Sequence, residues 1–162
     1  MNFGYSPPTP TYKLATICMN GHIVSSEQAN YHKYCMDCGE GTTSECLHCK
    51  ANIKGDLEHD YTFSILDRVQ AYCYECGEPH PWTVRLLEHA VEIIGLDEKL
   101  STEDKEIVKL AIPGLIVDIP SSPVSVAKYK KFMPKASDFV QEGIQNLLID
   151  VVTDKIKTAI WG

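Results

Sequence analysis

Apolar residues recur every three or four positions from Trp82 to the end of the chain, and this spacing predicts amphipathic helices. The first predicted helix begins at Trp82 and ends near Gly95, with an apolar face made of Val84, Leu87, Ala90, Val91 and Ile94. The second begins at Ser101, which forms an approximate capping box with Asp104, and is broken at Pro113.

Two more helices are predicted further along the chain. The third opens at Ser122, as a cap before Pro123, and ends before Pro134, because proline disfavours a helical residue ahead of it. The fourth runs as one helix from near Ser137 to Ile160. Its apolar stripe consists of Val140, Ile144, Leu147, Leu148, Val151, Ile156 and Ile160.

This last stripe has two interpretations. It packs against the other helices, or it binds a partner. About eighty residues offer little surface to cover so long a stripe, and Trp161 adds a large apolar group where chains usually fray. We therefore expect a protein partner or a second copy of the chain to dock on the C-terminal helices.

The chain before Trp82 has a different pattern. Residues 1–12 contain Pro7, Pro8 and Pro10 and predict a flexible lead. Residues 13–81 are rich in cysteine, glycine and polar turns, which favours short β-hairpins. The segment 57–74 is ambiguous between a helix and a strand pair; it carries Tyr61, Phe63, Ile65, Leu66, Val69 and Tyr72. We thus predict an α+β protein with a cysteine-rich domain over 13–81 and a helical domain over 82–162.

Eight candidate metal ligands occur as four short pairs. In chain order, the first to fourth pairs are Cys18/His22, Cys35/Cys38, Cys46/Cys49 and Cys73/Cys76. A spacing of two or three residues lets one backbone turn aim both side chains at the same ion. Glycine follows the second and fourth pairs and permits the positive φ that such a turn often requires. Eight ligands make two tetrahedral sites, so we expect two Zn²⁺ ions per chain and predict that residues 13–81 form a double zinc ribbon.

The sequence leaves open which pairs share an ion. Only seven residues separate the second and third pairs, which favours one site made of these two and another made of the first and fourth. A cross-braced order, with the first pair joined to the third and the second to the fourth, is the main alternative. Both arrangements fill two sites with protein ligands.

Such sites are structural, because a catalytic zinc keeps one coordination position open. The nucleobase-deaminase pattern, with a glutamate two residues after a ligand histidine, is missing after His22. Iron also suits four thiolates, whereas the histidine favours zinc.

Four further histidines, His32, His48, His59 and His80, are expected at the surface, with His80 as an alternative ligand.

The chain resembles small, uncharacterised bacterial zinc-ribbon proteins. These combine a Cys-x-Asn-Gly-His turn with three later cysteine pairs and a helical tail. The matching stretches are Cys18–His22, Tyr34–Gly39, Cys46–Gly55 and Tyr72–Thr83. The resemblance implies a bacterial or phage origin and metal binding, and it implies no activity.

The composition of the chain bears on its cellular compartment and on the state of its cysteines. All seven cysteines lie between Cys18 and Cys76, and the N-terminal sequence has no apolar run after a basic start. We expect a cytoplasmic protein whose cysteines bind metal rather than form disulfides. The net charge of −7 argues against general binding of nucleic-acid backbones.

The acidic chain contains one basic cluster, in which lysines alternate with aromatic residues. It consists of Lys128, Lys130, Lys131 and Lys135, interleaved with Tyr129 and Phe132. It is typical of a solvated helix face whose aromatic residues pack inward, and the alternative is a phosphate contact.

No catalytic triad, phosphate-binding loop or dinucleotide fingerprint is present in the sequence, so we expect no catalytic site. The favoured function is a zinc-binding adaptor that binds another protein. The alternatives are a nucleic-acid-binding regulator and an accessory subunit of an enzyme complex.

Overall fold

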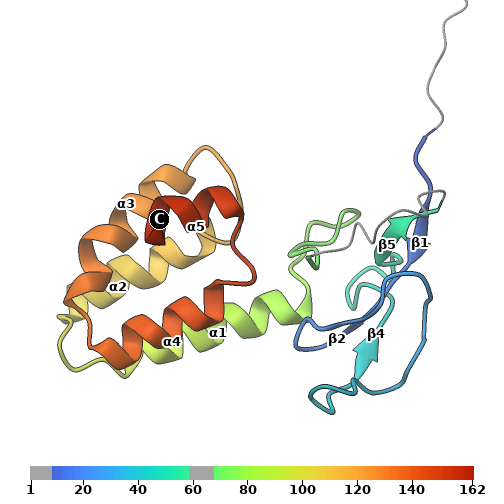
Figure 1. Cartoon of the computed structure of the whole chain (residues 1–162), viewed down its shortest axis with the longest axis horizontal. Coiled ribbons are helices and arrows are strands. Elements are labelled where there is room, and N and C mark those ends of the chain that lie inside the picture. The colour runs from blue at the N-terminus through green and yellow to red at the C-terminus, as the bar shows by residue number, and fades with distance from the viewer. Residues whose placement is uncertain (1–8, 59–67) are drawn as a thin grey trace, which may run out of the picture. The chain divides into compact units, whose positions relative to one another are not determined.

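The structure is a computed structural model that describes residues 9–58 and 68–162. It is an α+β fold, with short antiparallel strands followed by five helices (Figure 1). The chain divides into two compact units, Met1–Trp82 and Thr83–Gly162, called here the N-terminal unit and the helical unit. Part of the ambiguous segment 57–74, with Tyr61, Phe63, Ile65 and Leu66, lies outside the described residues.

The described part of the N-terminal unit contains two small antiparallel sheets. Strand β1 (Tyr12–Leu14) pairs with β5 (Lys54–Leu57). The second sheet has the order β3-β2-β4, built from β2 (Thr16–Cys18), β3 (Ile23–Ser25) and β4 (Thr42–Thr43). The hairpins predicted for this region are present, and no strand in its described part is longer than four residues.

The apolar core formed by the described residues of this unit is very small. Its buried members are Ala15, Ile17, Ile53 and Trp82, with Val69 packed against them. A buried polar contact supplements the core, where the hydroxyl oxygens of Thr16 and Ser44 lie 3.1 Å apart. On their own, these described residues bury too little apolar surface to stabilise a unit of this size.

The helical unit is formed mainly by five helices and two short 3₁₀ turns. The helices are α1 (Pro81–Gly95), α2 (Thr102–Ala111), α3 (Ser122–Phe132), α4 (Asp138–Leu148) and α5 (Asp154–Trp161), and the turns span Ile112–Gly114 and Met133–Lys135. The N-cap predicted for the second helix is confirmed, since Ser101 Oγ accepts a hydrogen bond from the Asp104 N–H at 3.1 Å. On α1, Ala90 and Ile94 are buried, while Val84 and Val91 are exposed.

The role predicted for Ser122 is wrong. Ser122 is the first residue of α3 rather than its cap, and its buried hydroxyl group fastens the preceding loop instead. It donates to the Val117 carbonyl at 2.7 Å and accepts from the Ile119 N–H at 3.0 Å. The predicted end of this helix is confirmed, because α3 stops at Phe132 and Pro134 lies in a 3₁₀ turn.

The single helix predicted from Ser137 to Ile160 is also wrong, because the chain forms α4 and α5 with a break between them. Thr153 starts the second helix as its N-cap and accepts a hydrogen bond from the Ile156 N–H at 3.3 Å. The break lets both segments bury apolar residues in the same core. Val140, Ile144, Leu148, Val152 and Ile156 are all at least 97% buried there.

The remaining C-terminal features also pack on this core. The Trp161 ring meets the buried Tyr129 ring edge to face, with centroids 6.3 Å apart. Docking of a partner on these helices stays a prediction, and most of the stripe proposed for it is covered within the unit. Among the described residues, no helix combines the length and the apolar character that crossing a membrane requires.

Candidate metal centres

The four ligand pairs lie on four tight turns of the N-terminal unit. The first pair brackets the β2–β3 hairpin, with Cys18 ending β2 and His22 preceding β3. Gly21 turns the chain there with a φ of +90° and donates its N–H to the Cys18 carbonyl at 2.9 Å. A Cβ atom on Gly21 would lie 3.1 Å from Trp82 Cβ, so the turn also needs glycine for space.

The other three pairs share one backbone design. In each, the N–H of the first cysteine donates to the carbonyl five residues later, and the N–H four residues after that cysteine donates back to its carbonyl. A β-bridge closes each turn: Tyr34↔Gly41, Glu45↔Asn52 and Tyr72↔Pro79. The residue after each second cysteine has a positive φ, namely Gly39 at +73°, Lys50 at +65° and Gly77 at +76°. The third turn thus has the same conformation without glycine.

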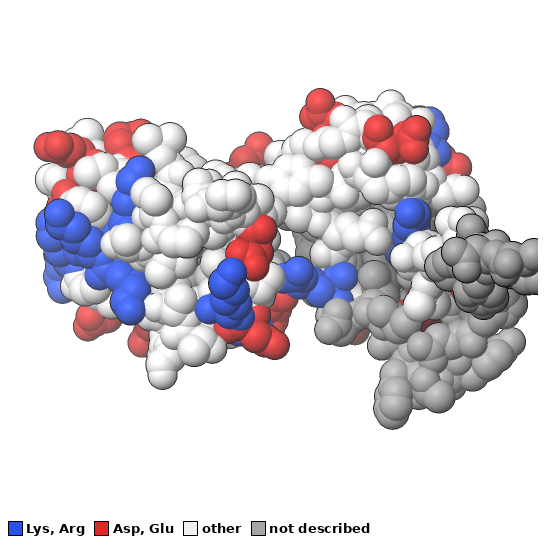
Figure 2. Space-filling model, turned by 90° about the horizontal axis from the view of Figure 1, so that it is seen from above, with Lys and Arg blue, Asp and Glu red and all other residues white. Residues whose placement is uncertain are grey.

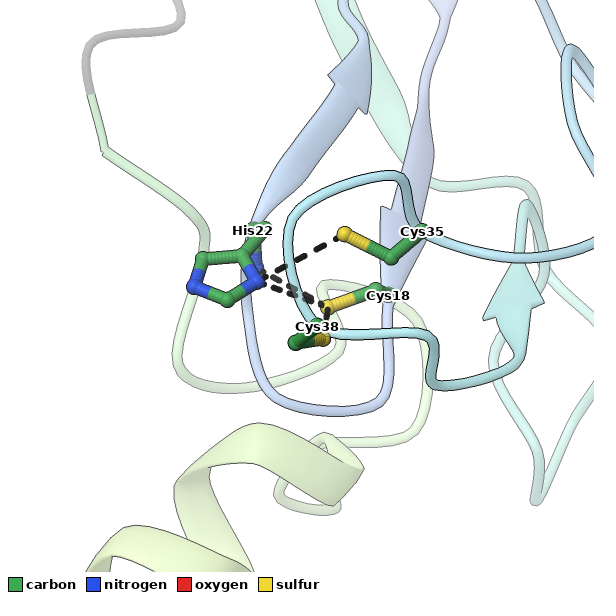
Figure 3. A group of neighbouring side chains, drawn as sticks. All are labelled: Cys18, His22, Cys35 and Cys38. Atoms are coloured by element: carbon green, nitrogen blue, oxygen red, sulfur yellow. Dashed lines mark hydrogen bonds between the residues drawn. The ribbon is translucent and has the colours of Figure 1, made fainter.

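The structure gathers the eight predicted ligands into two groups of four. Site 1 consists of Cys18, His22, Cys35 and Cys38, and site 2 of Cys46, Cys49, Cys73 and Cys76. Within each site the ligand atoms lie within 4.8 Å of one another. The side chains of site 1 point toward a common centre (Figure 3).

The nested pairing favoured from the sequence is wrong, and so is the cross-braced alternative. Consecutive pairs share a site: the first with the second, and the third with the fourth. The reason lies in β4, which pairs with β2 through Ile17↔Thr43 and Cys18↔Thr42. The seven-residue spacer therefore leads the chain away from site 1 along β2 instead of folding back to close one site.

The separations between ligand atoms fit a tetrahedral ion. Sulfur atoms at about 2.3 Å from a tetrahedral centre lie about 3.8 Å apart, and a nitrogen at about 2.0 Å lies about 3.5 Å from each sulfur. The measured Sγ–Sγ separations are 3.8 Å for Cys18–Cys38, 3.8 Å for Cys46–Cys76 and 3.7 Å for Cys49–Cys73. His22 Nδ1 lies 3.5 Å from Cys18 Sγ and 3.6 Å from Cys35 Sγ. The side chains are thus placed as a bound metal ion would require.

Each site has a buried and an exposed half. Cys18, Cys35, Cys46 and Cys73 are buried, whereas His22, Cys38, Cys49 and Cys76 are exposed. All seven cysteines are free thiols in the structure. A metal ion at either site would lie at the edge of the unit, held by two ligands from the interior and two from the surface.

The thiols of these sites differ in acidity. The backbone N–H of Glu40 and the Asn20 side chain lower the pKa of Cys38 to about 6, although burial opposes them. Burial raises the pKa of Cys18 to about 11. In site 2, backbone N–H groups of Cys76 and Glu75 lower the pKa of Cys73 to about 7. A metal ion binds thiolates, so binding at either site releases protons and weakens as the pH falls.

The other histidines that the structure describes contribute no ligand atom to either site. His48 lies exposed inside the third turn and His32 is exposed, as predicted, while His59 lies outside the described residues. The prediction for His80 is wrong, because this side chain is only 3% exposed and stacks on Trp82 with ring centroids 4.6 Å apart. Burial, together with the nearby His48, lowers the pKa of His80. The signal that could have placed it was its position two residues before Trp82.

The fold and the two sites define an α+β protein with zinc-ribbon-like cysteine clusters. The chain belongs to a family described as an uncharacterized protein conserved in bacteria (DUF2321), whose model matches residues 11–160. The resemblance found in the sequence is therefore confirmed. No curated protein and no solved structure matches the chain.

Proposed function

We propose that the chain is a non-enzymatic adaptor in which two structural zinc ions hold the N-terminal unit in the shape that binds another protein. The observation that carries this proposal is that eight protein ligand atoms form two complete four-ligand sets. A tetrahedral ion held by four protein ligands has no position open for water or substrate. The arrangement therefore favours a structural role over a catalytic one.

The small core of the N-terminal unit supports the structural role. Four buried side chains and one neighbour make up its described apolar core. Units of this size usually need metal ions or disulfides to fold, because they bury too little apolar surface to offset the loss of chain entropy. Two metal ions would supply the missing stability.

Zinc is the metal favoured by the ligand set. Site 1 offers three thiolates and one imidazole, and site 2 offers four thiolates. Both sets are common at structural zinc sites, and tetrahedral sulfur ligands alone also suit iron. The imidazole at site 1 favours zinc there, and the shared turn design supports the same metal at site 2.

The protein-binding part of the proposal is supported by the loop that enters site 1. Tyr31, Tyr34 and Met36 are 48%, 57% and 84% exposed, and His32 and Lys33 between them are exposed as well. Tyrosine and methionine are enriched in protein interfaces, where charged residues are depleted. Large side chains displayed together in this way favour a contact surface.

The backbone beneath these side chains is held in place. The Tyr31 N–H donates to Thr16 Oγ1 at 3.1 Å, and the Thr42 N–H donates to the Lys33 carbonyl at 3.3 Å. Cys35 then fastens the loop to site 1. A loop fixed in advance loses little conformational entropy on binding, which favours affinity.

Native mass spectrometry of protein purified without chelator tests the metal part. We expect two zinc ions per chain. His22→Ala should leave one tightly bound zinc ion, because it removes a ligand of site 1 only. The matched control is His48→Ala, which lies within a cysteine turn but outside both sites and should retain two. A wild-type chain that folds with one metal ion or none contradicts the proposal.

The adaptor part needs a second experiment. A tagged chain is recovered from bacterial cells, and we expect one other polypeptide to copurify with it in a fixed ratio. The double variant Tyr34→Ser and Met36→Ser should keep both metal ions and lose that polypeptide, while Phe139→Ser on the helical unit should retain it. A wild-type chain that repeatedly purifies alone removes the support for an adaptor.

A further inference from the structure

Helix α3 presents a basic surface that the proposed adaptor function does not use. No aspartate or glutamate occurs between Asp118 and Asp138, and the same stretch contains four lysines, Lys128, Lys130, Lys131 and Lys135. The chain as a whole has a net charge of −7, so this segment concentrates positive charge in a protein that is otherwise acidic. The basic surface therefore needs a physical explanation of its own.

The packing of α3 turns the lysines outward. Tyr129 and Met133 are 5% and 3% exposed and face the core of the helical unit, which confirms the inward packing expected from the sequence. All four lysines are exposed. Figure 2 shows lysine and arginine side chains grouped at the left end of that view, with acidic side chains along the edges of the group.

Among the described residues, three of the four lysines have no carboxylate partner. Lys135 Nζ lies 3.0 Å from Asp104 Oδ2 and 4.7 Å from the centre of the Phe132 ring. In residues 9–58 and 68–162, no ion pair involves Lys128, Lys130 or Lys131. These three residues, called here the lysine ridge, carry charges that the described part of the chain does not neutralise.

We propose that the lysine ridge binds the phosphate backbone of a nucleic acid without reading its sequence. Sequence-independent binding of this kind rests on lysine and arginine contacts to phosphates. Among the side chains that read bases by paired hydrogen bonds, α3 contains only lysine and lacks arginine, asparagine and glutamine, so it is poorly equipped to distinguish sequences. This binding is a function separate from the proposed adaptor role and does not depend on it.

The composition of the ridge favours a nucleic acid over an acidic protein. Protein interfaces are depleted in lysine and depend on large apolar or aromatic residues near their centre. On α3 the two aromatic residues are buried or half-buried, and Val124 is its one exposed large apolar side chain. A row of point charges without an apolar centre fits phosphates better than a folded protein surface.

Three phosphate contacts set the expected strength. The logarithm of the affinity should fall with the logarithm of the salt concentration with a slope of about −2.7, at about 0.9 per contact for double-stranded DNA. Raising the salt from 50 to 200 mM should therefore weaken binding about 40-fold. The acidic residues elsewhere on the chain oppose binding, so measurements must begin at low salt.

Fluorescence anisotropy of the metal-loaded full chain tests this proposal. The probes are labelled 20-base-pair DNA of two unrelated sequences and a single-stranded RNA of 20 nucleotides. We expect both DNA sequences to bind equally, with the salt slope given above. The triple variant Lys128→Gln, Lys130→Gln and Lys131→Gln should lose at least tenfold in affinity, with its helical circular dichroism unchanged.

The matched control carries the same loss of charge at other positions of the helical unit, namely Lys99→Gln, Lys155→Gln and Lys157→Gln. It should keep most of its affinity. An equal loss in both variants, or no binding of any probe at 20 mM salt, overturns the proposal. So does sedimentation that shows a salt-sensitive dimer lost in the ridge variant and no complex with the probes, because the ridge would then bind the acidic surface of a second copy. None of these outcomes changes the zinc count or the copurifying polypeptide, so the two proposals fail separately.

Discussion

The buried carboxylate of Asp97 organises the region where α1, α2 and α4 meet. Its Oδ1 accepts from the N–H groups of Lys99 and Leu100 at 2.7 and 2.6 Å, and its Oδ2 accepts from the N–H and Oγ–H of Ser137, both at 2.7 Å. Ser137 is the N-cap of α4 and makes no capping bond with its own side chain. Asp97 thus satisfies donors at the start of a helix from forty residues away in sequence.

Replacing Asp97 with asparagine should destabilise the helical unit by about 2–4 kcal/mol, because the new amide group turns donors toward donors at a site that is 98% buried. Urea unfolding of the metal-loaded protein, followed by far-ultraviolet circular dichroism, measures the change. Asp118→Asn is the control, since Asp118 makes an exposed ion pair with Lys155 worth less than about 1 kcal/mol. Equal stability of the two variants would contradict the role given to Asp97.

The same carboxylate predicts a pH dependence. Burial alone would raise the pKa of Asp97, but the hydrogen bonds from Ser137, Leu100 and Lys99 outweigh it and lower the pKa from 3.8 to about 2. The contribution to folding is therefore complete above about pH 4 and disappears as the pH falls through 2. The stability difference between wild type and Asp97→Asn should shrink by about 2 kcal/mol over that range. A difference that stays constant from pH 5 to pH 2 would show that the ionised carboxylate is not the stabilising form.

At the scale of elements, the three Cys-x-x-Cys turns share a backbone conformation but not the residue type at the position of positive φ. Gly39 and Gly77 follow the second and fourth pairs, whereas Lys50 adopts a φ of +65° after the third. A side chain in the left-handed region costs about 1 kcal/mol relative to glycine, and glycine returns part of this through the greater entropy of its unfolded chain. The third turn therefore carries strain that the other two lack.

Lys50→Gly should stabilise the metal-loaded N-terminal unit by about 0.5 kcal/mol, and Gly77→Lys should destabilise it by about 1 kcal/mol. The midpoint of urea unfolding measures both. Lys50→Ala is the control that removes the charge and keeps the Cβ atom, and it should give no gain. A gain as large for alanine as for glycine would mean that the charge of Lys50, rather than its backbone, is unfavourable.

The ligand turns also show how far the sequence could predict this fold. The spacing within each pair identifies eight residues that the structure gathers into two groups, since the spacing reflects one local turn. Which turns meet depends on β4, and two residues are too few to carry a strand pattern. The correct pairing was therefore not readable from the sequence.

The prediction of a single C-terminal helix was wrong for a related reason. Helical spacing predicts which residues are apolar on one face, and Val140, Ile144 and Ile156 are indeed buried. The spacing of apolar residues does not reveal the break between α4 and α5, after which the chain returns to the same core. Thr153 followed by Asp154 was the local signal for a new helix start, and the continuing apolar stripe concealed it.

At the scale of the whole molecule, the two units depend on different sources of stability. All eight ligands lie in the N-terminal unit, and the large apolar core lies in the helical unit. Stripping the metal with a strong chelator should therefore unfold the first and leave the second folded. Hydrogen exchange read by mass spectrometry should show rapid exchange over residues 12–58 and continued protection of α2, α3 and α4. Loss of protection in both units together would mean that they fold as one.

Because consecutive ligand pairs share a site, the two sites are completed one after the other as the chain leaves the ribosome. All four ligands of site 1 have been made once Cys38 is added, and Cys76 follows 38 residues later. At about 5–20 residues per second, synthesis of that stretch takes about 2–8 s. The same interval separates their emergence from the ribosome, so site 1 can close on its own ligands before the last two thiols of site 2 emerge. In a nested order, Cys18 and His22 would have no partner pair until Cys73 and Cys76 emerged. Until then, the four thiols of the second and third pairs would be close by, and some of them could bind a metal ion together with Cys18 and His22.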